Sequence, residues 1–227
     1  MTLPRQVRAV VFDMDGLLLD TEVAARDSFY EVAAERDLDV PMAVYVQMIG
    51  APGGAGRQAL LTHLGPDFQI EPLWAAWEAR FHLVTEAGVA LKAGVVELLD
   101  QLDASGLPRA VCTSSSHRMV DNHLGHHELL PRFDAVIARG DYAQGKPHPD
   151  PFLKAAEALG VEPEHCLALE DSHNGVRAAH AARMMTIMVP DLLHATEEIS
   201  ALCVRIAQDL HEVRALIATQ AETKEKA

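Results

Sequence analysis

The chain has 227 residues, of which 49% are hydrophobic and 23% charged. This composition is that of an ordinary globular protein and excludes a disordered, collagen-like or coiled-coil chain. Its 33 acidic and 19 basic side chains give a formal net charge of −14, which opposes nucleic-acid binding. Three scattered cysteines and the absence of an apolar run near 18 residues predict a cytoplasmic protein without a disulfide framework, signal segment or membrane span.

Five short apolar runs predict strands. Each run is continuous rather than alternating, which is typical of strands buried on both faces of a sheet. The runs cover residues 7–12, 109–112, 135–138, 166–169 and 185–189.

Helical patterns lie between these strands. Apolar side chains at helical spacing over residues 95–102 predict a helix that stops at Gly106. The next pattern has Asp150 as N-cap, Pro151 at the first helical position and a stop at Gly160. Such alternation predicts an α/β fold with a doubly wound, Rossmann-like parallel sheet, whose ligands bind at the carboxyl ends of the strands.

The C-terminal part of the chain carries one more helical pattern. Residues 196–217 predict a single amphipathic helix packed on the sheet, and residues 220–227 predict a frayed polar tail.

One long interval interrupts the alternation. Residues 20–90 have mainly helical patterns, with helices expected over 21–36 and 74–86, so we expect a helical cap inserted into a core of residues 1–19 and 91–227. The glycine-rich stretch 50–56 lacks the ending of a phosphate-cradling P-loop and is expected to be a turn. Two residues at this stretch, Gly50 and Arg57, are candidate substrate-binding residues.

Polar residues follow four of the predicted strands. Asp13 and Asp15 come directly after the first strand, and Ser114, Lys146 and the pair 170–171 follow later ones. Because the carboxyl ends of parallel strands share one edge of a sheet, we expect these side chains to converge there.

Taken in order, these residues resemble the four signature motifs of the haloacid dehalogenase superfamily. The motifs are residues 13–16, Ser114, residues 146–147 and residues 170–175, and the resemblance extends over residues 7–190. The continuation of the first motif and the helical insertion resemble the subgroup with an α-helical cap. That subgroup includes β-phosphoglucomutases, sugar-phosphate phosphatases and pseudouridine-5′-phosphatases, so the resemblance implies a phosphatase acting on a small phosphorylated metabolite.

The resemblance also implies catalytic roles. Asp13 would attack phosphorus to form an aspartyl-phosphate, and Asp15 would protonate the leaving oxygen and then deprotonate water. Because a free Asp with a pKa of about 3.9 is rarely protonated near pH 7, burial under the cap is expected to raise the pKa of Asp15. Lys146, the Ser114 hydroxyl and the Ser115 amide would bind phosphoryl oxygens, with Thr113 as the alternative to Ser114.

The cofactor implied is Mg²⁺, which prefers hard oxygen ligands. Asp13, the backbone carbonyl of Asp15 and Asp171 would supply them, and Glu170 is either a further ligand or a hydrogen-bond acceptor behind them. Two polar residues of the same motif, Ser172 and Asn174, would orient this acidic loop.

Most of the other reactive side chains are expected to have structural roles or to lie at the surface. Cys112 is expected to be a packing residue. His123, His126 and His127 are expected at the surface, since they lack metal-binding spacing. His148 and His173 lie within the motifs and are possible substrate contacts.

Two alternatives stay open. A β-phosphoglucomutase has a histidine a few residues after the first motif, whereas residues 23–26 of this chain lack one, which favours a phosphatase. A non-catalytic phospho-ligand-binding protein is the other alternative. A dehalogenase is disfavoured because such enzymes lack the second carboxylate, here Asp15. No nucleic-acid or membrane partner is expected, and the protein is expected to be a monomer or weak dimer.

Overall fold

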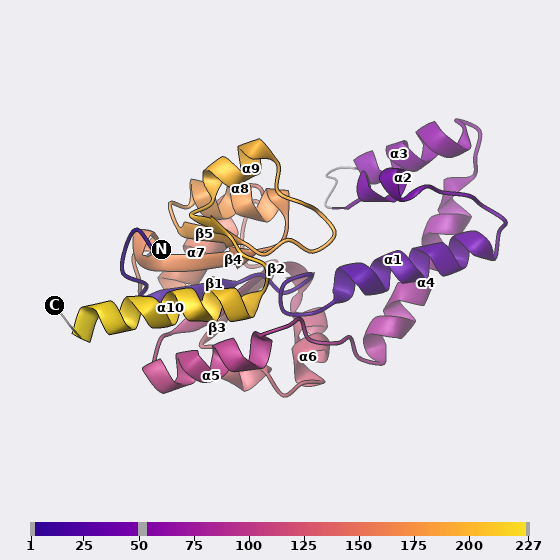
Figure 1. Cartoon of the computed structure of the whole chain (residues 1–227). Helices are drawn as coiled ribbons and strands as arrows, with labels where there is room; N and C mark the ends of the chain where they lie inside the picture. The colour runs from indigo at the N-terminus through magenta and orange to yellow at the C-terminus, as the bar shows by residue number, and fades with distance from the viewer. Residues whose placement is uncertain (1–2, 50–53, 226–227) are drawn as a thin grey trace. The chain divides into compact units, whose positions relative to one another are not determined.

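The computed structural model describes residues 3–49 and 54–225, drawn in Figure 1. By its internal contacts the chain divides into two compact units, Met1–Leu19 with Ala90–Ala227, and Asp20–Val89. We refer to these as the core unit and the cap unit. Among the described helices, none has the length and apolar character needed to cross a bilayer.

The core unit contains a six-stranded parallel sheet in the order β3-β2-β1-β4-β5-β6. This confirms the predicted α/β fold with a parallel sheet. The strands are β1 (Ala9–Phe12), β2 (Arg109–Ser116), β3 (Ala135–Arg139), β4 (Cys166–Glu170), β5 (Met185–Met188) and β6 (Arg205–Ile206).

Helices cover both faces of this sheet (Figure 1). On one face lie α5 (Val95–Ser105), α6 (His117–Gly125) and α10 (Leu210–Glu225), and on the other α7 (Asp150–Leu159) and α8 (His173–Ala181), with α9 (Glu197–Leu202) beside α8. Two 3₁₀ turns, Leu130–Arg132 and Pro163–His165, precede β3 and β4.

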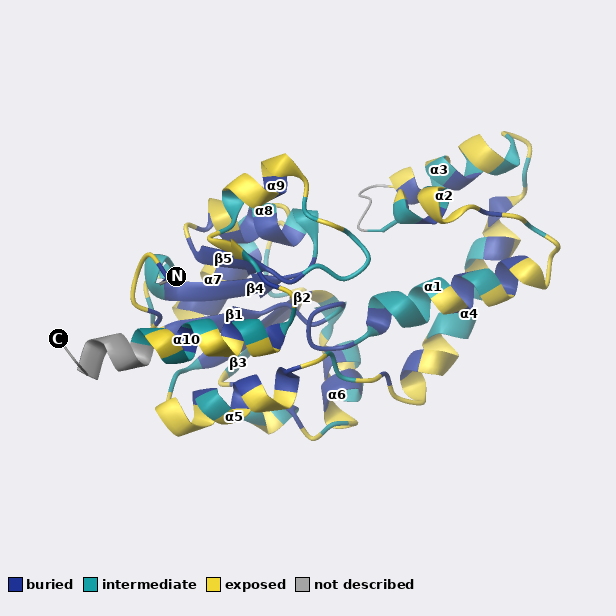
Figure 2. Ribbon diagram, in the orientation of Figure 1, coloured by how far each residue is buried: buried dark blue, intermediate teal, exposed yellow. Residues whose placement is uncertain are grey.

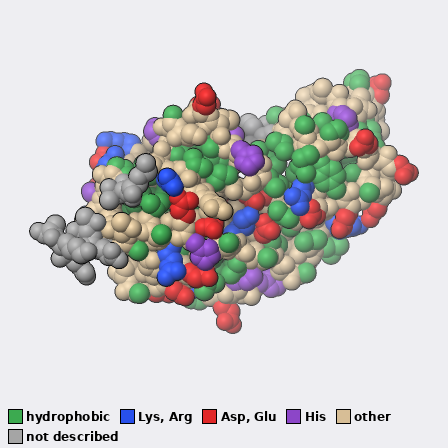
Figure 3. Space-filling model, viewed as in Figure 1, with side chains coloured by type: hydrophobic (Ala, Val, Ile, Leu, Met, Phe, Trp, Pro, Cys, Tyr) green, Lys and Arg blue, Asp and Glu red, His purple; other side chains and the backbone are tan. Residues whose placement is uncertain are grey.

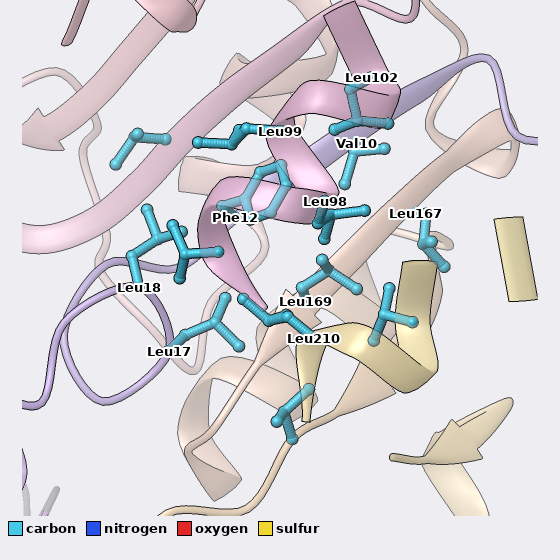
Figure 4. Close-up of a cluster of buried hydrophobic side chains, with 14 of the residues drawn as sticks. Val10, Phe12, Leu17, Leu18, Leu98, Leu99, Leu102, Leu167, Leu169 and Leu210 are labelled. Atoms are coloured by element: carbon cyan, nitrogen blue, oxygen red, sulfur yellow. The ribbon is translucent and has the colours of Figure 1, made fainter. Parts of the chain in front are cut away.

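Alternate residues of β1 supply the two hydrophobic layers. Val10 and Phe12 pack with α5 and α10, whereas Ala9 and Val11 pack with α7 and α8. This explains the continuous apolar run, because both faces of the strand are covered. Figure 2 shows the central strands buried and the helices with one buried face, and Figure 4 shows leucines of β4, α5 and α10 in the same cluster as Phe12.

Capping glycines end the helices where the sequence predicts. Gly106 follows α5 and Gly160 follows α7, each with a φ near +60° that favours glycine. Asp150 is the first helical residue of α7 and not its N-cap, because the carbonyl of Pro149 already accepts the helical hydrogen bond from Leu153 at 3.0 Å.

The prediction of one helix over residues 196–217 is wrong. The short strand β6 separates α9 from α10, because Val204 and Ala207 donate backbone hydrogen bonds to β5 and so add an edge strand. The predicted frayed tail is also wrong up to Glu225, since α10 continues to that residue. Gln220 helps to hold this helix by bonding the backbones of Arg5 and Val7 at 2.7 and 2.8 Å.

The cap unit is helical. Its helices are α1 (Thr21–Ala34), α2 (Met42–Val46), α3 (Ala55–Leu64) and α4 (Ile70–Glu86), and α1 packs along α4. Ring contacts hold it together, as Phe29 lies 5.3 Å from both Tyr45 and Trp77 between ring centroids. Acidic side chains are spread over the visible face of both units (Figure 3).

Candidate active site

The loop after β1 carries two carboxylates on a hydrogen-bonded backbone. The chain turns at Gly16, whose φ of +80° suits glycine, and the amides of residues 18–19 both donate to the carbonyl of Met14. Asp13 is buried and Asp15 is half-buried. This loop therefore fixes both aspartates at the carboxyl end of β1.

Lys146 contacts residues in or directly after three strands, β1, β2 and β4. Its ammonium donates to Asp13 Oδ1 at 2.5 Å, to Glu170 Oε1 at 2.6 Å and to the carbonyl of Cys112 at 2.9 Å. The side chain is 7% exposed, and its three donors thus have three acceptors in a nearly dry environment. Charge-assisted bonds of this kind are the strong ones in proteins.

The charge of this cluster is not balanced by Lys146 alone. Burial of Lys146 would favour the neutral amine, but Asp13 and Glu170 outweigh it and hold the pKa of the ammonium well above its usual range. Burial also raises the pKa of Asp13, and the neighbouring carboxylates add to this while Lys146 opposes it. With the carboxylate of Asp171 close to those of Asp13 and Glu170, the cluster has an excess of negative charge that a further cation could neutralise.

The acidic loop between β4 and α8 is held by Ser172. Its hydroxyl accepts from the amide of Gly175 at 3.1 Å as the N-cap of α8, and donates to Glu170 Oε2 at 2.9 Å. The Ser172 amide donates to the same oxygen at 3.2 Å. Both oxygens of the Glu170 carboxylate therefore have protein donors, Lys146 on one and Ser172 on the other.

A divalent-metal site fits these residues. One carboxylate oxygen from each of Asp13, Glu170 and Asp171 lies within 4.8 Å of the others, and all three residues are buried. An all-carboxylate set of hard oxygens suits Mg²⁺ better than a soft metal. Both oxygens of Glu170 already have protein donors, so this carboxylate would bind a metal only in exchange for one of them.

Hydroxyl groups at the end of β2 lie against one oxygen of Asp15. Ser115 Oγ is 2.7 Å and Thr113 Oγ1 is 3.4 Å from Asp15 Oδ2, and the Ser115 amide donates to Thr113 Oγ1 at 3.0 Å. Ser114 is exposed at the same strand end. The structure thus brings Thr113 and Ser115 to Asp15, whereas the exposed Ser114 side chain is hydrogen-bonded to Tyr142.

Some polar residues of the predicted site make other contacts. The Asn174 side-chain oxygen accepts from Arg177 at 3.4 Å, within α8. His173 Nε2 lies 2.9 Å from the carbonyl of His194. Cys112 is fully buried in β2, and burial raises the pKa of its thiol to about 12, which agrees with a packing role.

The expectation of a surface position is wrong for His123. Its side chain is 3% exposed, and its Nδ1 lies 4.0 Å from Asp15 Oδ1. His126 is exposed and His127 half-buried. The position of His123 three residues after Val120 and one before Leu124 places it on the buried face of α6, and this spacing was the available signal in the sequence.

In the cap unit, the Arg57 side chain contacts two residues of α4. Its guanidinium lies 2.6 Å from Glu71 and 4.7 Å from the ring centroid of Trp74. A substrate-binding role for Arg57 stays a prediction. Gly50, the other cap residue of the predicted site, lies outside the described residues.

Comparison with known proteins finds a hydrolase family model and relatives that are named as phosphatases. A family model described as haloacid dehalogenase-like hydrolase matches residues 7–183. Hexitol phosphatase B of Escherichia coli K12 is 32% identical over 84% of this chain and 86% of its own length. Fructose-1-phosphate phosphatase YqaB of the same strain is 33% identical over 79% of this chain and 95% of its own length.

A solved structure matches the described fold. The crystal structure of a hydrolase of the same family from Deinococcus radiodurans R1, with bound phosphate and sodium, has a TM-score of 0.80 and 27% identity. The match covers 95% of this chain and 96% of that one.

Proposed function

The chain belongs to the haloacid dehalogenase-like hydrolase family, and from this premise we propose that it is a Mg²⁺-dependent phosphatase of a small phosphorylated metabolite. One observation carries the proposal: the buried Asp13 carboxylate lies 2.5 Å from the Lys146 ammonium and beside the carboxylates of Glu170 and Asp171. A nucleophile, a fixed positive charge and a set of hard metal ligands thus meet at one sheet edge.

Asp13 is the nucleophile in this proposal. An oxygen of its carboxylate forms a bond to phosphorus while the bond from phosphorus to the ester oxygen breaks, which leaves a phosphoryl group on Asp13. Water then attacks phosphorus and releases phosphate and the free carboxylate. The contact with Lys146 supports this role, because the ammonium orients Asp13 and offers positive charge to the phosphoryl oxygens.

Asp15 transfers the protons. It gives one to the leaving ester oxygen as that bond breaks and takes one from the attacking water in the second step. The bond from Ser115 Oγ at 2.7 Å supports this role, since it fixes one carboxyl oxygen and leaves the other to exchange the proton. The Ser114 hydroxyl, exposed at the same strand end, is assigned to the phosphoryl oxygens.

The metal would be held by Asp13 and Asp171, with the backbone carbonyl of Asp15 as a further oxygen donor. When bound, Mg²⁺ supplies positive charge that offsets the repulsion between an anionic nucleophile and an anionic phosphate ester. Glu170 would act behind these ligands, because Lys146 and Ser172 already occupy its two oxygens.

A hexose or hexitol phosphate is the substrate class we favour. Two relatives that are over 30% identical carry the names of a hexitol phosphatase and a fructose-1-phosphate phosphatase. With only 19 basic residues against 33 acidic ones, the chain depends on local charge such as Lys146 to bind an anionic ester.

Phosphate release from a panel of substrates tests the proposal. The panel holds fructose 1-phosphate, mannitol 1-phosphate, β-glucose 1-phosphate, pseudouridine 5′-phosphate and p-nitrophenyl phosphate, each with Mg²⁺ or with EDTA. We expect hydrolysis that needs Mg²⁺ and is lost in Asp13→Asn. Activity that survives both changes would contradict the proposal, and conversion of β-glucose 1-phosphate to its 6-phosphate without phosphate release would favour a mutase.

A further inference from the structure

His123 occupies an apolar helix face. The buried residues of α6 are Val120, His123 and Leu124, spaced three and one apart along one side of the helix. A leucine would satisfy packing at the middle position, whereas the nitrogens of a buried imidazole need polar surroundings. The polar groups around His123 therefore bear on its role.

One ring nitrogen of His123 faces Asp15. Its Nδ1 lies 4.0 Å from Asp15 Oδ1, whereas Oδ2 of the same carboxylate takes the hydroxyls of Ser115 and Thr113. Hydroxyls thus lie against one carboxylate oxygen and the imidazole lies beside the other. A distance of 4.0 Å exceeds a hydrogen bond, so Nδ1 acts on Oδ1 electrostatically, through the polarity of the ring.

We propose that His123 is a positioning residue for Asp15, which holds the carboxyl group in the orientation from which it protonates the leaving oxygen. The inference rests on the proposed function, in which that proton moves from Asp15 to the ester oxygen as the bond to phosphorus breaks. Acid catalysis needs a fixed carboxyl, because the proton must reach one particular atom. With hydroxyls on Oδ2 alone, the carboxyl group could rotate about that contact. The imidazole beside Oδ1 restricts this rotation.

Three substitutions separate the parts of this role. Asn at position 123 places an amide atom where Nδ1 lies, Gln places one where Nε2 lies, and Leu keeps the bulk without a polar atom. His126→Asn is the matched control, because His126 is exposed near the end of the same segment.

Two substrates report on proton transfer. p-Nitrophenyl phosphate has a weakly basic leaving group that needs little protonation, whereas the sugar alkoxide of fructose 1-phosphate or mannitol 1-phosphate needs it strongly. We expect His123→Leu and His123→Gln to lower kcat/KM for the sugar phosphate by about tenfold or more, and for p-nitrophenyl phosphate by less than about threefold. His123→Asn and His126→Asn should stay within about threefold of wild type on both substrates.

Equal losses on both substrates, or no loss in His123→Leu and His123→Gln, would overturn the inference. Asp15→Asn in the same assay separates this from failure of the proposed function: if that variant shows the leaving-group-dependent loss and the His123 variants do not, the function stands and the positioning role is wrong. If Asp15→Asn keeps full activity on the sugar phosphate, both proposals fail.

Thermal unfolding of each variant checks the fold. If His123→Leu does not fold, the comparison of His123→Asn with His123→Gln still decides, since both keep an amide and differ in which ring nitrogen they imitate.

Discussion

A Cβ atom added to Gly175 would lie 1.9 Å from the carboxylate of Glu170. Because residue 175 is a glycine, the first turn of α8 approaches the buried end of β4 more closely than a side chain at this position would allow. Gly175→Ala should push the Glu170 carboxylate away from Lys146 and leave two buried charges poorly paired, which costs about 1–3 kcal/mol of unfolding free energy. Urea denaturation measures this loss, and the phosphatase assay should show a parallel fall in activity.

The control for this change is Gly125→Ala. Gly125 lies at the end of α6 with no atom within 4 Å of an added Cβ, so its substitution should be neutral or stabilise the protein by up to about 1 kcal/mol. An unchanged stability in Gly175→Ala would show that the Glu170 carboxylate can take another position without loss of unfolding free energy.

Lys146→Met tests the buried ion cluster. The substitution keeps most of the side-chain volume but removes the ammonium that contacts both Asp13 and Glu170, and we expect a loss of about 3–5 kcal/mol of unfolding free energy. Activity should be lost as well. Lys154→Met, at an exposed position of α7, should leave both quantities unchanged within about 0.5 kcal/mol. Similar stabilities for the two variants would mean that the cluster adjusts its protonation instead.

Asp171→Asn tests the metal site. Because an amide oxygen is a weaker ligand than a carboxylate, the Mg²⁺ concentration needed for half-maximal activity should rise by about tenfold or more. A titration of activity with Mg²⁺ measures it. Asp121→Asn, at an exposed position of α6, should not shift the titration. An unshifted midpoint in Asp171→Asn would remove Asp171 from the proposed ligands.

Glu212 gives a pH-dependent contribution to stability. The backbone amide of Gln208 and then the side chain of Arg205 hold the pKa of Glu212 below its ordinary value of 4.5. A lowered folded-state pKa means that the contribution is present above pH 4.5 and is lost as the pH falls through the folded-state pKa.

Glu212→Gln should therefore destabilise the protein at pH 7, by less than about 1 kcal/mol for a largely exposed pair. The difference from wild type should shrink as the pH falls below 4.5 and through the lowered folded-state pKa, which urea denaturation at several pH values can follow. A difference that is the same at all pH values would instead indicate a packing effect.

Much of the fold could be predicted because the patterns are local. The continuous apolar run ending at Phe12 indicates a strand covered on both faces, and Gly106 marks a helix end by its left-handed backbone. The strand β6 was not predicted, because a strand of two residues, Arg205 and Ile206, is too short to show a pattern. Its pairing with β5 also depends on a separate segment of the chain.

The convergence of Asp13, Lys146 and Glu170 could be anticipated because each follows a strand of one parallel sheet. The contacts of Asp15 with Ser115 and His123 could not, since they depend on side-chain direction at the end of β2 and on the rotation of α6. Such directions are set by tertiary packing and leave no mark in the local sequence beyond the helical spacing of His123.

The bonds from Gln220 to Arg5 and Val7 bring the first and last described segments of the chain together. The same pairing means that removing the last helical turns would uncover the backbone that leads into β1, and a shortened protein would lose support at the strand that carries the first aspartate.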